Sequence, residues 1–452
     1  MRAFSFIRGF WEHTNRGGDI MDSIWQKTSE KRSFSALKGD MKTDVLIIGG
    51  GLAGILCAYM LSEAGVDNML VEASEICSGV TKNTTAKLTF QHGLIYDKLI
   101  RSLGEERAAM YLSANRSALE KYRELCADID CNFEEKSSFV YSLYSRRKIE
   151  REVAALRRLG CNAEFMSDTM LPFPVAGAVR VDRQAQFDPL RFVYAISEGL
   201  NIFENTKVRA LTPKGAITSR GKIRAEKIII ATHFPILNKH GGYFIKMYQD
   251  RSYVIALKNA QDVGGMYIDE SGKGLSFRNY QGQLLLGGGS HRTGKNGGGW
   301  RELEAVAKNM YPDAKITARW ATQDCMTLDS VPYIGRYSKS APNLYVATGF
   351  NKWGMTSSMV AAQILSGMII GTTPDCAAVF SPSRSILHPQ LLANAFETTV
   401  GLLTPTVPRC PHLGCALKYN KQEHSWDCPC HGSRFEKDGR LLDGPATDDK
   451  RM

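Results

Sequence analysis

Two short runs near the end of the chain concentrate side chains that bind metals. Residues 410–415 read CPHLGC and residues 428–433 read CPCHGS, which together offer four cysteines and two histidines. Thiolates and imidazoles at this spacing bind zinc or an iron–sulfur cluster. Zinc takes four ligands, whereas the runs offer six candidates, four of which follow the order Cys-x-His and Cys-x-x-His, so zinc is disfavoured. A metal-free disulfide knot is the third alternative.

The two runs resemble the cluster loops of the Rieske 2Fe-2S family, including the glycines and prolines that shape those loops. In that family two thiolates bind one iron of the cluster and two imidazoles bind the other. The ligands that the resemblance implies are Cys410 and Cys428 on one iron and His412 and His431 on the other.

A second cysteine pair bears on the kind of Rieske protein. Cys415 and Cys430 match the cysteines that form a disulfide bond between the loops in Rieske proteins of the cytochrome bc type, and that Rieske oxygenases lack. Those oxygenases also need a mononuclear iron site with two closely spaced histidines. Outside the tail, His233 and His240 are the nearest pair and lack that spacing, so we expect electron transfer rather than ring hydroxylation. His424 matches no ligand position and is interpreted as a surface residue.

A glycine-rich turn near the front of the chain predicts a dinucleotide site. The stretch DVLIIGGGLAG, from Asp44, is an apolar strand that leads through Gly49, Gly51 and Gly54 into a helix. Gly49 permits the tight turn, Gly51 lets the backbone approach a pyrophosphate, and Gly54 lets helix and strand pack closely. A second strand ends at Glu72, which can accept a hydrogen bond from a ribose hydroxyl. This unit alone does not distinguish FAD from NAD.

Later segments resemble the D-amino-acid oxidase-like (glycine/sarcosine oxidase) FAD superfamily. They are RWATQDCMTLDSVPYIG at 319–335, NLYVATGFNKWGMTSSMVAAQIL at 343–365, and the passage from AQFDPLRFVYAI at 185–196 to KIIIATHFP at 227–235. The resemblance covers about residues 42–380 and implies that the cofactor is FAD. The FAD contacts that it implies, or for which the loop after Glu72 offers candidates, are Ser78, Gly79, Thr84, Thr85, Val208, Gly349, Gly354, Met355 and Thr356.

Substrate and catalytic residues are less sharply indicated. Lys87 lies near the place where relatives have a basic residue beside the flavin, and a solvated surface lysine is the alternative. An arginine in the predicted substrate sheet could hold a carboxylate with two hydrogen bonds. The candidates in that sheet are Arg251, Tyr253, Arg278, His291 and Arg292, of which Arg278 and His291 join Lys87 as catalytic candidates. In this superfamily a hydride passes to the flavin from a C–H next to nitrogen, so substrate positioning dominates.

The predicted fold class is α/β (α+β), with a Rossmann-type FAD-binding domain, an interleaved antiparallel-sheet substrate domain and a small all-β Rieske domain. The predicted ranges are 1–40 for an N-terminal extension, 41–380 for the oxidoreductase domain and 381–452 for the Rieske domain. Within the oxidoreductase domain, about 41–90, 181–239 and 319–380 are expected to bind FAD, and about 91–180 and 240–318 to form the substrate part. We hypothesise that translation starts at Met21, so that residues 1–20 are not translated.

The Rieske domain is expected to be abbreviated. Only 29 residues separate Phe380 from Cys410, and the run LLANAFETTVG within them is typical of a helix rather than of strands. The base of the domain is therefore either shortened or borrowed from the flavin domain.

Composition and charge limit the kinds of molecule that the protein is expected to bind. The 452 residues carry a net charge of +11, but the basic residues are dispersed, which argues against a nucleic-acid partner. The apolar stretches 45–61 and 359–370 are broken by glycines or too short, so no membrane span is expected. No secretory signal opens the sequence, and we expect a cytoplasmic protein.

The combined pattern predicts a dehydrogenase that oxidises an amine or amino acid with FAD and relays electrons through the Rieske 2Fe-2S cluster to an external acceptor protein. One alternative is an oxygen-using oxidase with a structural or redox-sensing cluster. Another is a non-enzymatic redox sensor. The sequence does not give the direction of electron flow, so the outside protein is an acceptor or a donor.

Overall fold

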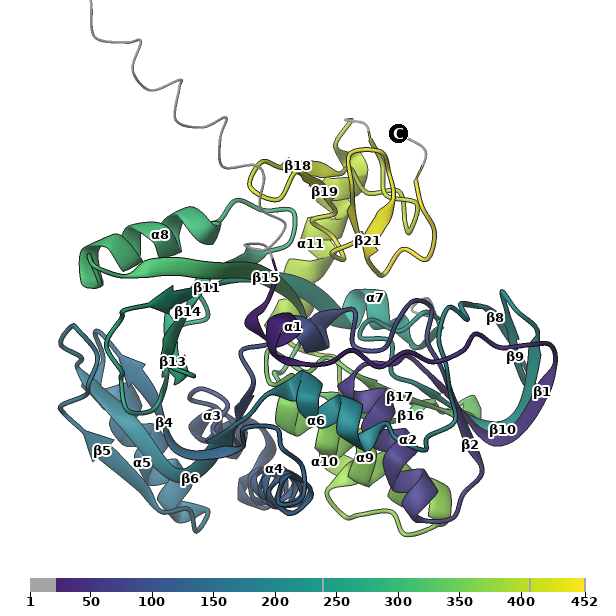
Figure 1. The fold of residues 1–452 in the computed structure, drawn as a ribbon, viewed down its shortest axis with the longest axis horizontal. Helices are drawn as coiled ribbons and strands as arrows, with labels where there is room; N and C mark the ends of the chain where they lie inside the picture. The colour runs from purple at the N-terminus through teal and green to yellow at the C-terminus, as the bar shows by residue number, and fades with distance from the viewer. Residues whose placement is uncertain (1–21, 238–239, 406–407, 451–452) are drawn as a thin grey trace, which may run out of the picture.

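The structure is a computed structural model that describes residues 22–237, 240–405 and 408–450. Two large sheets and one small sheet form its framework, with helices packed around the larger two (Figure 1). The helices are α1 (Ile24–Thr28), α2 (Leu52–Glu63), η1 (Val80–Asn83), α3 (Tyr96–Leu103), α4 (Glu105–Cys126), α5 (Arg146–Arg158), α6 (Pro189–Ile196), η2 (His240–Gly242), α7 (Tyr243–Lys246), α8 (Gly299–Met310), α9 (Gly354–Ile370), α10 (Ala377–Phe380) and α11 (Pro389–Leu403). None of the helices in this part of the chain has the length and apolar character that crossing a bilayer requires.

The first sheet is built mainly of parallel strands. Its order is β16 (Tyr333–Ser338), β17 (Ala341–Thr348), β10 (Lys222–Ile230), β1 (Met41–Ile48), β2 (Asn68–Val71) and β7 (Ile202–Phe203), and β8 (Val208–Thr212) and β9 (Gly215–Thr218) attach beside β10. The strands from β17 to β7 are parallel, and β16 runs antiparallel. Runs such as VLII in β1 are buried on both faces, as parallel sheets require. The Rossmann-type expectation is confirmed.

The second sheet is mainly antiparallel, as predicted for the substrate part. Its order is β15 (Lys315–Thr327), β11 (Met247–Lys258), β14 (Gln283–Arg292), β13 (Ser276–Tyr280), β12 (Met266–Asp269), β4 (Glu134–Ser142), β6 (Gly177–Gln186) and β3 (Lys87–Leu88), with β5 (Ala163–Met166) beside β6. One pair, β12 with β4, is parallel. Since β15 belongs to this sheet over its whole length, the predicted boundary at residue 319 cuts through a strand.

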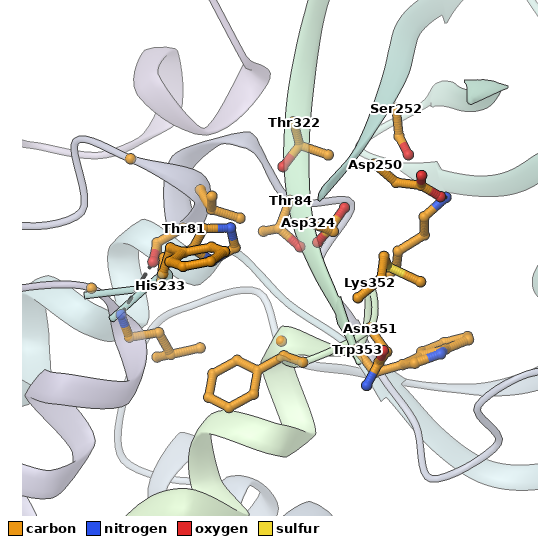
Figure 2. Close-up of a pocket in the computed structure, with 18 of the residues that line it drawn as sticks. Thr81, Thr84, His233, Asp250, Ser252, Thr322, Asp324, Asn351, Lys352 and Trp353 are labelled. Carbon is orange, nitrogen blue, oxygen red and sulfur yellow. Dashed lines mark hydrogen bonds and ion pairs between the residues drawn. The ribbon is translucent and has the colours of Figure 1, made fainter. Parts of the chain in front are cut away.

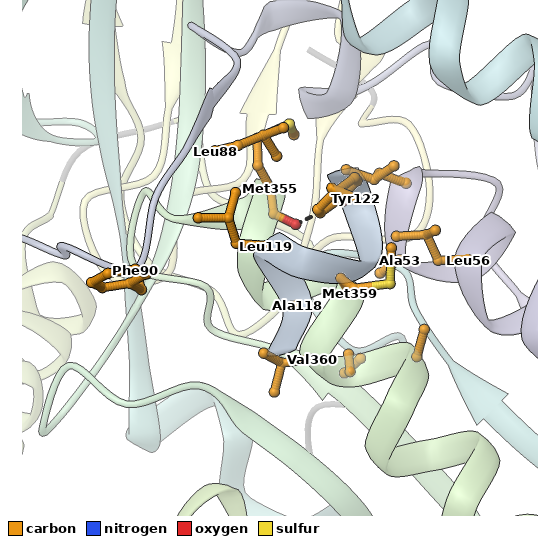
Figure 3. Packing of buried hydrophobic residues seen from close by; sticks show 14 of the residues in the cluster. Ala53, Leu56, Leu88, Phe90, Ala118, Leu119, Tyr122, Met355, Met359 and Val360 are labelled. Carbon is orange, nitrogen blue, oxygen red and sulfur yellow. Dashed lines mark hydrogen bonds between the residues drawn. The ribbon is translucent and has the colours of Figure 1, made fainter. Parts of the chain in front are cut away.

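A continuous apolar core joins α2 and α9, the two helices that follow glycine-containing turns, to the rest of the molecule. Figure 3 shows α2, α4 and α9 meeting there, with Leu56, Leu119 and Met359 packed together. The hydroxyl of Tyr122 donates a hydrogen bond to the carbonyl of Met355 at 2.8 Å, which ties α4 to the first turn of α9. The start of α9, which the flavin resemblance singled out, is therefore held by buried contacts.

The small sheet contains β18 (Lys418–Asn420), β19 (Ser425–Asp427), β20 (Arg434–Phe435) and β21 (Leu441–Asp443) in sequence order. The run LLANAFETTVG lies within α11, which confirms the predicted helix. This helix packs beside α7 of the large unit and beneath the small sheet, where a Cβ on Gly401 would lie 2.4 Å from the Cys430 sulfur.

The segment before β1 is partly built into the fold. Trp25 of α1 is fully buried, and its indole N–H donates a hydrogen bond to the Thr84 carbonyl at 2.8 Å. The hypothesis that translation starts at Met21 concerns residues that lie outside the described part of the chain.

Candidate functional site

A cavity of about 950 Å³ lies between the parallel and antiparallel sheets (Figure 2). This volume is at the upper end of the usual range for ligand pockets. The turn after β1, the end of β2, the loop 77–87, strands β11 and β15 and the loop before α9 all contribute to its wall. Most of the predicted FAD contacts line it, namely Gly49, Gly51, Glu72, Ser78, Gly79, Thr84, Thr85, Val208, Gly354 and Met355.

The glycine turn has the geometry that a dinucleotide requires. Gly49 has a φ of +112°, which few residues other than glycine adopt, and α2 begins directly after Gly51. The carboxylate of Glu72 accepts hydrogen bonds from the backbone N–H groups of Gly50 at 2.7 Å and Ser74 at 2.9 Å. Burial raises the pKa of Glu72. A helix N-terminus and a Cβ-free backbone at the cavity wall fit the pyrophosphate of FAD.

Three predicted FAD residues lie behind the cavity wall. Gly54 packs against Gly49, Gly349 has a φ of +71° and lies beside Thr327, and Thr356 is buried. The Thr356 hydroxyl donates to the Thr89 carbonyl at 3.1 Å. These residues shape the wall rather than face the cavity.

Replacing Gly54 with valine is expected to cost FAD binding. A Cβ at this position would lie 1.9 Å from the Gly49 carbonyl oxygen, so α2 must move away from the turn. An overpacking cost of about 1–3 kcal/mol, if borne by the FAD-bound form, corresponds to about 5- to 150-fold weaker FAD binding. The FAD-to-protein ratio after gel filtration measures the effect. Ala64→Val is the control, since Ala64 is exposed at the C-terminal end of the same helix and does not line the cavity, and equal FAD content in both variants would contradict the prediction.

Lys87 lies in the cavity wall and is not a solvated surface lysine. Its side chain is buried, and its ammonium group donates to the Thr85 hydroxyl at 3.2 Å. Burial, together with the nearby Arg278 guanidinium, lowers the pKa of Lys87 to about 7. This lysine can therefore exchange a proton near neutral pH.

Arg278 does not line the cavity, contrary to its expected position beside a substrate carboxylate. It is fully buried, and its Nη1 donates to the carbonyls of Thr85 at 2.5 Å and Ala86 at 2.7 Å. The guanidinium also lies 5.4 Å from the ring centroids of Trp25 and Tyr280. Arg278 thus holds the loop that carries Lys87.

The four other substrate candidates lie at the contact between the antiparallel sheet and residues 408–450, which carry the predicted cluster loops and are called the Rieske segment below. Arg292 donates to the carbonyls of Pro429 at 3.1 Å and Cys430 at 3.0 Å, next to predicted cluster ligands. Glu423 forms an ion pair with Arg251 and accepts from the Tyr253 hydroxyl at 2.8 Å. His291 stacks on Tyr253 with ring centroids 5.6 Å apart and does not line the cavity. Of these residues Tyr253 alone reaches the cavity wall.

Strands β11 and β15 present two different faces. Gln249 donates to the His431 carbonyl at 2.8 Å, and Gln323 donates to the Gly432 carbonyl at 2.9 Å. The alternate residues on the same strands line the cavity, because successive side chains of a strand point to opposite faces. Those residues are Tyr248, Asp250, Ser252, Thr322, Asp324 and Met326. A single layer of sheet therefore separates the cavity from the predicted cluster loops.

The predicted cluster residues converge. The thiol of Cys428 lies beside the thiols of Cys410, Cys415 and Cys430, and the rings of His412 and His431 have centroids 5.0 Å apart. His431 is buried, and within the described chain neither of its ring nitrogens has a hydrogen-bond partner. Buried imidazole nitrogens without partners, next to thiols, fit a metal cluster.

The tightest group of possible ligands differs from the predicted set. It contains Cys415, Cys428 and His431, whose ligand atoms lie within 4.8 Å of one another. Cys415 and Cys430 are free thiols, so the predicted disulfide bond is not formed in this structure. With four thiols in one buried group, proximity does not separate cluster ligands from a loop-joining pair. The assignment of Cys410 as ligand stays a prediction.

The C-terminal loop also reaches the cavity. Leu441, Gly444, Pro445 and Thr447 contribute to the wall near Val208. The contact is reinforced by Lys207, which also lines the cavity, and by Arg209, each of which lies 3.4 Å from an Asp448 carboxylate oxygen. The Rieske segment thus completes the cavity in addition to docking beside it.

Sequence reasoning missed the polar residues at the end of the cavity that β11 and β15 form, which is called the sheet end below. Asp250, Asp324 and Lys352 line this end, and none was a candidate. The available signal was the polar run QDRS in MYQDRSYVIALK and the polar run TQD in KITARWATQDCMT, since successive side chains of a strand alternate between its two faces. That alternation predicts two faces but not which face meets the cavity.

Family models match nearly the whole chain. The model for FAD dependent oxidoreductases matches residues 44–368, and the model for Rieske [2Fe-2S] domains matches residues 397–451. The protein YhfW of Bacillus subtilis (strain 168), named as a Rieske 2Fe-2S iron-sulfur protein, is 34% identical over 94% of this chain and 96% of its own length. Gamma-glutamylputrescine oxidoreductase of Escherichia coli (strain K12) is 23% identical over 75% of this chain and 86% of its own.

Solved structures support the same fold. L-proline dehydrogenase from P. horikoshii superposes with a TM-score of 0.65 and 18% identity, over 77% of this chain and 98% of that one. Glycine oxidase from Bacillus cereus ATCC 14579 gives a TM-score of 0.61 and 20% identity, over 76% and 100%. The domains bind FAD and a Rieske 2Fe-2S cluster. The chain therefore belongs to the FAD dependent oxidoreductase family and carries a C-terminal Rieske domain.

Proposed function

We propose that this oxidoreductase removes two electrons from an amine or amino acid and delivers them, through the Rieske cluster of the same chain, to an external acceptor protein. When bound, FAD would accept a hydride from the substrate, and the cluster would carry electrons one at a time. The proposed cluster ligands are Cys410, His412, Cys428 and His431.

The observation that carries this proposal is the shared wall between the two cofactor sites. Gln249 and Gln323 hold the backbone on the histidine side of the cluster loops, while their strand neighbours line the cavity. Phe244 lies against His431, with ring centroids 6.1 Å apart, so this imidazole faces the flavin domain. Such an arrangement favours transfer between the cofactors without movement of the domain.

The same contacts support the borrowed base expected for the short Rieske domain. Arg292 holds the Pro429 and Cys430 carbonyls, and Gln422 donates to the Gly298 carbonyl at 3.1 Å. The cluster loops are thus braced by strands that belong to the oxidoreductase domain. Such contacts favour a cluster that stays in place during electron transfer over a Rieske domain that moves between partners.

An anaerobic stopped-flow experiment tests the relay. Amines and amino acids are mixed with the holoenzyme, and flavin absorbance and the EPR signal of the reduced cluster are followed together. The proposal expects cluster reduction within the time of one turnover. Flavin bleaching with a cluster that stays oxidised would favour the oxidase alternative, and no bleaching with any substrate would favour a redox sensor. Flavin reduction that starts from a reduced cluster would reverse the proposed direction.

A further inference from the structure

The sheet end of the cavity carries a pair of carboxylates in direct cross-strand register. Asp250 on β11 pairs with Asp324 on β15, and both side chains line the cavity. Figure 2 shows them projecting from neighbouring strands together with Ser252 and Thr322. Like charges directly opposite each other destabilise a sheet. A structural reason for this pair is therefore weak, whereas a ligand that carries positive charge would stabilise it.

One cation from the chain already approaches the pair. The Lys352 ammonium lies 3.5 Å from an Asp250 carboxylate oxygen. Lys352 and its neighbour Asn351 both have positive φ, of 71° and 52°, a backbone conformation that costs free energy in residues other than glycine. The Asn351 side chain fixes this turn by accepting from the Thr327 N–H at 2.8 Å. One lysine against two carboxylates leaves this end with a net negative charge.

Among the described residues, the cavity lacks an arginine that could hold a substrate carboxylate with two hydrogen bonds. The three arginines expected there are engaged elsewhere, since Arg278 supports the Lys87 loop and Arg251 and Arg292 hold the Rieske segment. Within the described chain the Thr322 hydroxyl, on the strand that carries Asp324, is buried and has no hydrogen-bond partner.

We propose that Asp250 and Asp324 bind a protonated amine of the substrate, and that the substrate is an aliphatic diamine or polyamine without a carboxylate beside the reacting carbon. This inference rests on the proposed function and names its substrate class. Loss of hydride from carbon requires a neutral amine at that carbon, so the ammonium group held by the carboxylates is a second nitrogen. The acidic pair would also repel the phosphates of FAD, which places it at the substrate end of the cavity.

Three ligands with four carbon atoms each test the assignment. They are 1,4-diaminobutane, butylamine and 4-aminobutanoate, which end in an ammonium, a methyl and a carboxylate group. Each is mixed with the FAD-loaded protein without oxygen, and the dependence of the flavin reduction rate on its concentration, or its competition with the diamine where it does not reduce the flavin, gives its dissociation constant. We expect the diamine to bind at least about tenfold more tightly than butylamine and 4-aminobutanoate to bind most weakly. Equal affinities, tighter binding of 4-aminobutanoate, or no binding of the diamine at millimolar concentration would overturn the proposal.

Substitutions separate charge recognition from structure. Asp250→Asn and Asp324→Asn are expected to weaken diamine binding at least about tenfold and to leave butylamine binding unchanged within about twofold. Lys352→Gln removes the competing cation and is expected to tighten diamine binding. A merely structural role would not produce effects of opposite sign. Asp313→Asn, on an exposed carboxylate outside the cavity, is the matched control with unchanged affinities.

Binding does not depend on the relay, so the two proposals fail separately. If butylamine reduces both cofactors and binds as tightly as the diamine, the relay stands and the diamine assignment is wrong. If the diamine binds selectively but its electrons never reach the cluster, the assignment stands and the relay is wrong. Unchanged diamine affinity in both aspartate variants, with normal FAD content, also counts against the assignment.

Discussion

His431→Ala is expected to abolish the Rieske cluster and, with it, electron delivery from this protein to one-electron acceptors. The imidazole is buried against Phe244, and within the described chain neither of its ring nitrogens has a hydrogen-bond partner, so both are free to bind iron. Loss of residues that merely support a metal ligand lowers affinity about 10- to 100-fold, and loss of a ligand should cost more. Iron content and the EPR signal of the reduced protein measure the result.

The matched control for this prediction is His424→Ala. His424 is exposed, and its Nδ1 lies 3.4 Å from the Tyr419 hydroxyl, away from the cluster loops. We expect this variant to keep its iron and its FAD and to show flavin reduction by substrate. A cluster of normal spectrum and iron content in His431→Ala would remove this residue from the ligand set.

The ligand-bearing motifs were predictable because their chemistry is local. The glycines at 49, 51 and 54 act within one turn, and the tail cysteines and histidines lie within two loops. Local sequence fixes such geometry through required φ angles, close backbone approach and ligand spacing. The structure accordingly places Gly49 at a φ of +112° and brings His412 and His431 together.

The substrate candidates were misplaced because their positions depend on which domain covers each face of a sheet. Arg251 and Asp250 are neighbours in sequence, yet Arg251 meets Glu423 of the Rieske segment and Asp250 lines the cavity. An arginine in a predicted substrate sheet has the same local signal on either face. Only the docking of residues 408–450 decides which side chains remain available to a ligand, and sequence periodicity carries no information about that docking.

The abbreviated base of the Rieske domain also depends on how the two domains dock. The sequence indicated a helix in place of strands and a base that is shortened or borrowed from the flavin domain, but not which residues support the loops, namely α11 and the Rieske-facing side chains of β11, β14 and β15. Because those strands also form the cavity wall, the support of one cofactor site is the wall of the other. A substitution at this contact should therefore affect both sites.

Glu423→Gln is expected to loosen that contact strongly. Only 7% of the Glu423 side chain is exposed, and its carboxylate accepts from Arg251 Nε at 2.9 Å, Arg434 Nη2 at 2.8 Å and the Tyr253 hydroxyl at 2.8 Å. Breaking a buried ion pair by removing one partner costs about 3–5 kcal/mol, because the remaining charges stay buried. Thermal unfolding should show a lower midpoint, and the FAD-to-protein ratio should fall because the Rieske loop that lines the cavity is released.

The pH dependence of stability gives an independent check. Burial alone would raise the pKa of Glu423, but Arg251 and Arg434 outweigh it and lower the pKa to about 2, from an ordinary value of 4.5. The unfolded chain therefore binds this proton more readily, so the stabilisation is present above about pH 4.5 and is lost as the pH falls toward 2. Glu423→Gln should remove this part of the acid sensitivity. Glu436→Gln, which removes an exposed ion pair with Arg440, should leave it unchanged, and an unaltered acid transition in Glu423→Gln would contradict the role of this carboxylate.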